Sequence, residues 1–233
     1  VDTLSLHDAL PILIGGDTTS SNAGLVISVT AIGLEKEVNI VKRSGAKPND
    51  LLVVTGDLGG AYLGLQILER EHSVFLANPN MQPEMEGFDY ILERQLKPEA
   101  RTDIKKKLEE LDILPTSMID VSDGLASEVL HLSDQSKVGF NVYEEKLPMD
   151  ETMIHTADEL NLNPAMAALN GGEDYELLFT ISSSDFDKIK NHPDFTIIGH
   201  ATETNAGNFL IARGSNQLIP LTAQGWDAFL NKE

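Results

Sequence analysis

The chain has 233 residues, 41% of them hydrophobic, enough to bury the core of one or two domains. Its 37 acidic and 17 basic residues give a formal charge of −20, which argues against nucleic acid or an anionic membrane as a partner, because phosphate groups are bound by surplus lysine and arginine. The chain has no cysteine, which excludes disulfides, zinc–thiolate sites and a thiol nucleophile and fits a cytoplasmic location. No apolar run approaches the roughly 18 residues that a membrane-spanning helix needs.

The first twelve residues, VDTLSLHDALPI, look foreign to the rest of the chain. They lack the basic start and the continuous apolar stretch of a targeting segment. Residues 3–12 resemble the in-frame translation of a common sequencing-library adapter. We therefore expect residues 1–12 to be an artefact of sequence assembly and native sequence to begin near Leu13. On this interpretation, part of the native N-terminal region is missing.

Beyond this segment, apolar runs alternate with turn-forming residues, a pattern that predicts alternating strands and helices. Strands are predicted, in chain order, for residues 24–34, 51–56, 116–121, 139–148, 175–182, 195–202 and 208–214. Helices are predicted for residues 59–71, 88–97, 100–112, 124–136, 150–162, 163–172 and 183–192. This order indicates an α/β (α+β) fold, in which helices pack on a mixed sheet.

Composition predicts a domain boundary at the Gly- and Pro-containing loop 43–50, RSGAKPND. Residues 43–233 are then expected to form one α/β domain, and residues 13–42 to belong to a different, N-terminal part of the protein. Arg43 and Lys47 in this loop are cations in a very acidic chain, and they could face an anionic ligand. The alternative is an exposed linker.

The first chemistry-bearing motif is GGDTTSSN, at residues 15–22. Gly15 and Gly16 allow the backbone to approach a ligand closely, and successive amides in such a turn can bind an anion. Asp17 adds an oxygen ligand for a hard cation. The motif is not a Walker A loop, because no lysine follows the glycines. A simple polar turn uses the same residues and stays open as the alternative.

The second motif is IDVSDGL, where Asp120, Ser122 and Asp123 follow an apolar strand. Ligands of open α/β sheets collect at the carboxyl ends of strands. Two carboxylates at such a position repel each other unless a cation lies between them, and Mg²⁺ is commonly held by one or two carboxylates together with substrate phosphates. The alternative is that Ser122 or Asp123 only caps the next helix.

The third motif is GGEDYELLFT, at residues 171–180. Its two glycines predict a tight turn, and Glu173 and Asp174 place two acids immediately before an apolar strand. Alternation along that strand predicts Tyr175, Leu177 and Phe179 on one core-facing side. The acids could equally be solvated loop residues.

Taken together and in this order, GGDTT, RSGAKPND, TGDLGG, IDVSDGL and GGEDYELLFT resemble the thiamine-monophosphate kinase family. That family belongs to the ATP-binding superfamily of aminoimidazole ribonucleotide synthetase. The resemblance covers residues 14–226. It implies that residues 43–233 are the C-terminal domain of that fold, with residues 13–42 a remnant of the N-terminal ATP-binding domain.

The resemblance also implies a reaction: direct, Mg²⁺-assisted transfer of the γ-phosphoryl group of ATP to thiamine monophosphate, giving thiamine diphosphate. No covalent nucleophile is expected, because such transfer needs mainly positioning and charge neutralisation. The family's site residues carry over to this sequence by motif: metal at Asp17, Asp120 and Asp123; ATP at Gly16, Asp17, Arg43 and Ser122; thiamine monophosphate at Glu173 and Trp226. A carboxylate and an aromatic ring both suit a cationic thiazolium.

Two other interpretations remain open. The chain could be another ATP-dependent enzyme of the same superfamily, such as an aminoimidazole ribonucleotide, selenophosphate or hydrogenase-maturation enzyme. It could also be an inactive fragment that binds metal or phosphate, because the family's N-terminal domain supplies further metal-binding acids and much of the ATP site. The same domain forms the family's dimer interface, so a homodimer is expected for the intact family member.

Overall fold

The computed structural model describes residues 33–223. The adapter-like segment, Gly16, Asp17, Trp226 and all but the end of the predicted strand 24–34 lie outside the described residues. The chain divides into two units, residues 1–36 and 37–233, and the second unit carries the fold described below.

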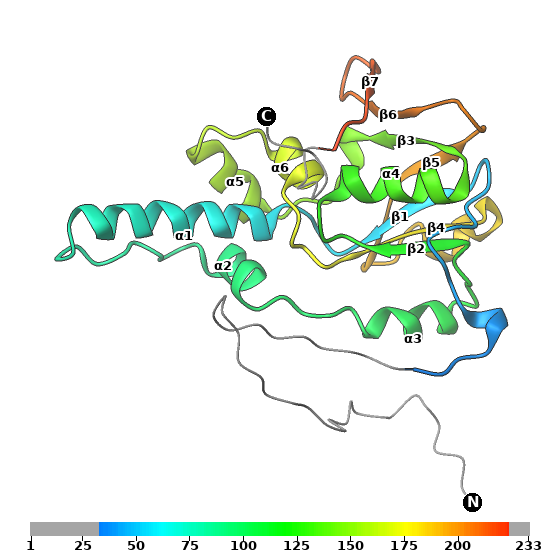
Figure 1. Ribbon diagram of the computed structural model, residues 1–233, viewed down its shortest axis with the longest axis horizontal. Helices are drawn as coiled ribbons and strands as arrows, with labels where there is room; N and C mark the ends of the chain where they lie inside the picture. Colours follow the sequence, from blue (N-terminus) through cyan, green and yellow to red (C-terminus); the bar gives the residue numbers. More distant parts are fainter. Residues whose placement is uncertain (1–32, 224–233) are drawn as a thin grey trace, which may run out of the picture. The chain divides into compact units, whose positions relative to one another are not determined.

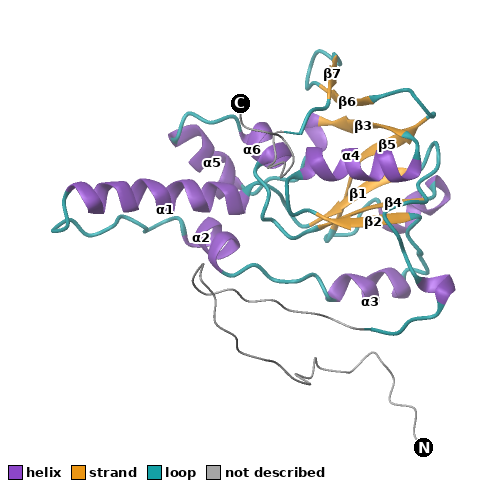
Figure 2. Cartoon of the chain, viewed as in Figure 1, coloured by secondary structure: helices purple, strands orange, loops and turns teal. Residues whose placement is uncertain are grey.

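A seven-stranded sheet is the centre of this unit, with strand order β2-β4-β1-β5-β3-β6-β7 (Figures 1 and 2). The strands are β1 (Leu51–Thr55), β2 (Ser117–Asp120), β3 (Gly139–Tyr143), β4 (Leu177–Ile181), β5 (Phe195–Thr202), β6 (Asn208–Ile211) and β7 (Leu218–Pro220). Neighbouring strands are antiparallel except for β3 and β6, which run parallel. The sheet is therefore mixed, as the sequence predicts.

Helices cover both faces of this sheet. They are α1 (Gly60–Ala77), α2 (Asp89–Leu96), α3 (Asp103–Glu110), α4 (Leu125–Ser136), α5 (Glu151–Glu159), α6 (Pro164–Asn170) and α7 (Phe186–Ile189). The larger apolar cluster joins one face of the sheet to α4, α6, α5, α1 and α2, and the smaller one joins the other face to α3 and α7. The sheet is thus the middle layer of three.

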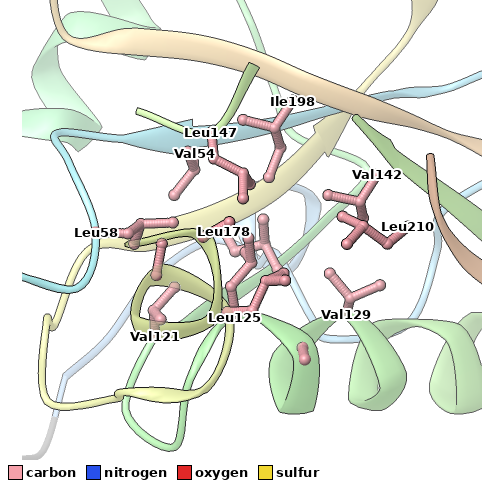
Figure 3. Close-up of a cluster of buried hydrophobic side chains, with 14 of the residues drawn as sticks. Val54, Leu58, Val121, Leu125, Val129, Val142, Leu147, Leu178, Ile198 and Leu210 are labelled. Carbon is pink, nitrogen blue, oxygen red and sulfur yellow. The ribbon is translucent and has the colours of Figure 1, made fainter. Parts of the chain in front are cut away.

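Period-two alternation divides the strand residues between the two clusters. In β1, Leu52 and Val54 belong to the larger cluster, whereas Val53 belongs to the smaller one. Figure 3 shows Leu125 and Val129 of α4 among the side chains of the larger cluster, and both are fully buried. Burying each such side chain contributes roughly 1.5–3 kcal/mol to folding, so α4 is fixed firmly against the sheet.

The predicted α/β class is confirmed, and most predicted elements are present with shifted ends. The region 183–192 forms a 3₁₀ turn followed by the four-residue α7, and β3 gives way at Glu144 to another 3₁₀ turn. The short strand β7 is an addition that the sequence pattern did not indicate. Within residues 33–223, no helix combines the length and the apolar character needed to cross a membrane.

Candidate functional site

Three loops meet at one edge of the sheet because β1 and β2 both run antiparallel to β4. Val54, near the end of β1, pairs with Leu178, and Asp120, the last residue of β2, pairs with Leu177. The loop after β1 (residues 56–59), the last residue of β2 with the loop that follows it (residues 120–124) and the loop before β4 (residues 171–176) therefore lie at the same edge. We call them the TGDLGG loop, the acidic loop and the GGEDYE loop.

The acidic loop carries three of the predicted site residues. Asp120 and Asp123 are exposed and Ser122 is half-buried, whereas Val121 and Leu125 on either side are fully buried in the core (Figure 3). The polar side chains are thus presented to solvent from a loop that is anchored on both sides. Asp120 and Asp123 lie at the carboxyl end of β2, as the sequence predicts.

A buried carboxylate that contacts this loop was not among the residues predicted from the sequence. Glu128, in the first turns of α4, is 2% exposed, and its Oε1 accepts hydrogen bonds from the Asp123 amide (3.1 Å) and the Ser122 hydroxyl (3.5 Å). Burial raises the pKa of Glu128, and the nearby carboxylates of Asp123 and Asp120 add to that rise. Glu128 therefore fixes the acidic loop to the start of α4 through these hydrogen bonds.

Capping does not account for the acidic loop. The N-cap of α4 is Gly124, and this helix end has no side-chain capping hydrogen bond. The role that the capping alternative gave to Ser122 or Asp123 is therefore wrong. The Asp123 carboxylate is exposed to a ligand, whereas the Ser122 hydroxyl donates to Glu128.

The GGEDYE loop lies against the acidic loop through three backbone hydrogen bonds. The Glu173 amide donates to Ser122 O (2.8 Å), the Tyr175 amide donates to Val121 O (2.9 Å), and the Val121 amide donates to Glu176 O (2.8 Å). The structure thus brings Glu173 beside Asp120, Ser122 and Asp123, from a part of the chain about 50 residues away.

Tyr175 corrects the sequence interpretation. It was predicted to share a core-facing side of the strand with Leu177 and Phe179, but β4 begins only at Leu177. Tyr175 has a φ of +51°, uncommon for a bulky side chain, and it is half-buried in the loop. Its hydroxyl donates to Glu173 Oε2 at 2.8 Å. Tyr175 therefore belongs to the site and not to the core.

The other two acids of the GGEDYE loop, Asp174 and Glu176, have buried side chains. Asp174 is 3% exposed, and its carboxylate accepts from the amides of Gly59 (2.9 Å) and Ala61 (3.4 Å), at the start of α1. Glu176 is 2% exposed and accepts from the Thr55 hydroxyl. Asp174 was open to interpretation as a solvated loop residue, and that alternative is wrong.

Two arginines from the α2–α3 region compensate this buried charge. Arg94 donates to Glu176 Oε1 (3.0 Å), to Asp174 O (3.2 Å) and to Asp57 O (3.0 Å), and Arg101 donates to the other oxygen of Glu176. Burial alone would lower the pKa of Arg94, but the surrounding carboxylates raise it. Arg94 thus ties the TGDLGG loop to the GGEDYE loop while staying charged.

Arg43 lies beside β2 and the end of α4. The carbonyl oxygen of Lys42 accepts from the Met118 amide in β2 (2.9 Å), two residues before Asp120, and the carbonyl oxygen of Arg43 accepts from the hydroxyl of Ser136, the last residue of α4 (3.4 Å). Among the described residues, no hydrogen bond or ion pair links the Arg43 side chain to the acidic loop, and its nucleotide contact stays a prediction.

The donor set of the acidic loop suits a hard cation. Two exposed carboxylates and a hydroxyl within four residues offer oxygen ligands, and Mg²⁺ takes its remaining ligands from water and phosphate. Among residues 33–223, no group of three or more acids or histidines is arranged as a complete metal site. Any metal held here would need oxygen ligands from elsewhere, such as a bound phosphate.

A pocket of about 290 Å³ opens beside the GGEDYE loop, between α1 and α6. Its lining mixes apolar and polar residues: Tyr62, Leu162, Asn163, Met166, Ala167, Asn170 and Gly171. Such a lining is compatible with a small heterocycle.

The contact between the two loops depends on Gly172. Gly172 has a φ of +70°, and a Cβ added there would lie 2.6 Å from Ser122 O. We expect Gly172→Ala to destabilise the chain by roughly 1–3 kcal/mol, through backbone strain and this clash. Urea unfolding measures the loss. Gly87→Ala is the matched control, because Gly87 has a φ of +87° with nothing within 4 Å of its added Cβ. Equal losses for the two variants would show that the loops can separate without cost.

The sequence matches the family described as AIR synthase related protein, C-terminal domain, over residues 47–211. The chain belongs to this family. The matched region contains the acidic loop, the GGEDYE loop and the TGDLGG loop.

Curated relatives agree with the predicted resemblance, which is confirmed. Thiamine-monophosphate kinase of Bacillus subtilis (strain 168) is 32% identical over 222 residues, covering 93% of this chain and 64% of the relative. The chain thus spans somewhat less than two thirds of that relative's length.

Solved structures have a similar fold. The structure of AaThiL complexed with AMPPCP and TMP is 31% identical, with a TM-score of 0.59 over 73% of this chain and 50% of that one. The hydrogenase maturation protein HypE of E. coli is 18% identical, with a TM-score of 0.54 over 78% of this chain and 53% of that one, a likeness of fold alone.

Proposed function

We propose that this chain binds ATP, Mg²⁺ and thiamine monophosphate and takes part in transfer of the γ-phosphoryl group to give thiamine diphosphate. The observation that carries the proposal is the joining of Asp120, Ser122 and Asp123 to Glu173 at one sheet edge by backbone hydrogen bonds. The 31% identity to AaThiL, solved with AMPPCP and TMP, supports it.

In this proposal the acidic loop faces the phosphates. Asp120 and Asp123 would hold the metal, and the Ser122 hydroxyl would turn from Glu128 Oε1, 3.5 Å away, to donate to a phosphate oxygen. Glu128 fixes the loop by accepting from the Asp123 amide. Bound there, Mg²⁺ neutralises phosphate charge and orients the transferred group.

Glu173 faces the other substrate. Its exposed carboxylate attracts the positive thiazolium of thiamine monophosphate beside the phosphate end. Four further contacts complete the proposal from the family resemblance: Gly16 and Asp17 at the nucleotide and metal, Arg43 at ATP, and Trp226 at the substrate rings. A homodimer and a cytoplasmic location belong to the proposal on the same ground, and light scattering of the purified chain tests the first.

A product assay tests the reaction. The purified chain is incubated with ATP, MgCl₂ and thiamine monophosphate, and thiamine diphosphate is measured by thiochrome fluorescence after separation. Bacillus subtilis thiamine-monophosphate kinase serves as the positive control. Absence of product from this chain under conditions where the control is active would show that the chain alone does not catalyse the transfer.

Calorimetric titration with AMPPCP, with and without MgCl₂, separates the two alternatives. An inactive fragment that still binds metal and nucleotide gives Mg²⁺-dependent binding without product. The other alternative is a different ATP-dependent enzyme of the superfamily, and HypE has a fold similar to that of this chain. Such an enzyme would bind nucleotide and consume ATP whether or not thiamine monophosphate is present.

Asp120→Asn tests directly whether Asp120 binds the metal. We expect kcat/KM to fall by about a hundredfold or more, because the phosphate charge loses a preorganised counter-ion ligand, and a higher MgCl₂ concentration should recover part of the loss. Asp134→Asn makes the same change on an exposed acid of α4 that pairs with Lys137 at 2.9 Å, and it should leave kcat/KM unchanged. If kcat/KM of the Asp120 variant depended on MgCl₂ concentration in the same way as that of the wild type, Asp120 would not be a metal ligand.

A further inference from the structure

Tyr175 occupies an unusual backbone position for an aromatic residue. Glu173 and Tyr175 have φ values of +62° and +51°, and each non-glycine residue in this region costs of the order of 1 kcal/mol or more. The backbone hydrogen bonds to Ser122 O and Val121 O, and the buried side chains of Asp174 and Glu176, hold the loop in this conformation. In this conformation the side chains of Glu173 and Tyr175 reach the solvent-accessible side of the loop, whereas those of Asp174 and Glu176 are buried.

Packing does not explain the tyrosine. Tyr62 and Tyr90 lie against the larger apolar cluster, whereas Tyr175 is part of neither cluster. What Tyr175 does make is the 2.8 Å hydrogen bond from its hydroxyl to Glu173 Oε2. That bond raises the pKa of Tyr175, with burial and the nearby carboxylates of Asp120 and Asp123 adding to it. The phenol therefore stands among the acids of the site.

We propose that Tyr175 is a positioning residue, whose hydroxyl orients the Glu173 carboxylate toward the cationic part of the substrate. This inference rests on the proposed function for the identity of that substrate. A Glu173 side chain without the phenol would sample several rotamers, and fixing it in advance lowers the entropy lost on binding. Tyr175 thus acts through Glu173 and does not itself contact the transferred phosphoryl group.

A double-mutant cycle tests whether Tyr175 works through Glu173. We expect Tyr175→Phe to raise KM for thiamine monophosphate by roughly five- to tenfold, the upper range of one ordinary hydrogen bond, because this bond to a carboxylate is partly exposed to solvent. KM for ATP should stay unchanged. Glu173→Gln should raise KM for thiamine monophosphate by about ten- to a hundredfold, and adding Tyr175→Phe to it should change nothing further.

Tyr143→Phe is the matched control, because it removes a hydroxyl that bonds to His200 on another part of the sheet (3.1 Å). It should leave both KM values as they are. If Tyr175→Phe raised KM by the same factor with and without Glu173→Gln, Tyr175 would act independently of Glu173. An equal rise in KM for ATP would show that the hydroxyl supports the loop as a whole. Either result overturns the proposal.

A second measurement needs no substrate. In the ligand-free chain labelled at tyrosine ¹³Cζ, with Tyr175 assigned through Tyr175→Phe, Glu173→Gln should lower the pKa of Tyr175 toward its ordinary value and leave the Tyr143 resonance unchanged. An unchanged Tyr175 titration would overturn the coupling, whatever the substrate. A wild-type chain that makes no thiamine diphosphate counts against the proposed catalysis by this chain alone and is recognised before any variant is assayed. The titration then still decides whether Tyr175 is coupled to Glu173.

Discussion

Replacing Arg94 with methionine should lower the free energy of unfolding by about 3–5 kcal/mol, because it removes one partner of a buried ion network and leaves its acids uncompensated. Arg94 lies 3.0 Å from Glu176 Oε1 and 3.7 Å from Asp174 Oδ1, and the side chains of these two acids are 3% and 0% exposed. Methionine replaces the length of the side chain but none of its hydrogen bonds. Urea unfolding followed by circular dichroism measures the loss.

Two further variants make this prediction specific. Arg213→Met removes an exposed arginine and should change the free energy of unfolding by no more than about 0.5 kcal/mol. Adding Glu176→Gln to Arg94→Met should recover part of the stability, since one unpaired buried charge disappears. A loss below 1 kcal/mol for Arg94→Met would mean that Arg101, also bonded to Glu176, compensates the network by itself.

Asp174 should make the chain less stable as the pH rises toward neutrality. Burial raises the pKa of Asp174 to about 7, although the Gly59 amide and Arg94 act in the opposite direction. An acid whose pKa is higher in the folded than in the unfolded state binds its proton more tightly when folded. Its contribution to stability is therefore greatest at low pH and is lost as the pH rises from about 4 to about 7.

Asp174→Asn removes this titration while keeping a carbonyl oxygen that can accept from the Gly59 amide. Between pH 5 and pH 8 the wild type should lose about 3 kcal/mol relative to the variant, at roughly 1.4 kcal/mol for each of about two pH units below the folded pKa. Urea unfolding at both pH values measures the difference. Asp158→Asn, on an exposed acid of α5, is the control and should follow the wild type. Parallel curves for the wild type and the Asp174 variant would contradict the raised pKa.

Much of the fold could be predicted from the sequence because the strands and helices are marked by apolar periodicity and by turn residues. The strand predicted at residues 195–202 coincides with β5, and α2 and α4 begin within one residue of their predicted starts. The acidic loop was also predictable, because polar residues directly after an apolar strand point to a ligand-facing edge.

The parts that could not be predicted depend on contacts between distant segments. No local pattern indicates that Asp174 and Glu176 are buried, because their compensating cations, Arg94 and Arg101, come from another region of the chain. The positive φ of Tyr175 is likewise imposed by hydrogen bonds to the acidic loop. Glu128 did leave a signal, since it interrupts the apolar stripe formed by Leu125, Val129 and Leu132.

The pairing of β1 has a consequence for biosynthesis. β1 lies between β4 and β5 in the sheet, and both of these neighbours come late in the chain: Val54 pairs with Leu178 in β4, and Leu51 pairs with His200 in β5. While the ribosome is still making α1 to α6, this apolar strand has neither partner within the sheet described here. Closing such long loops is slow, so the nascent chain must keep β1 from aggregating until β5 has emerged.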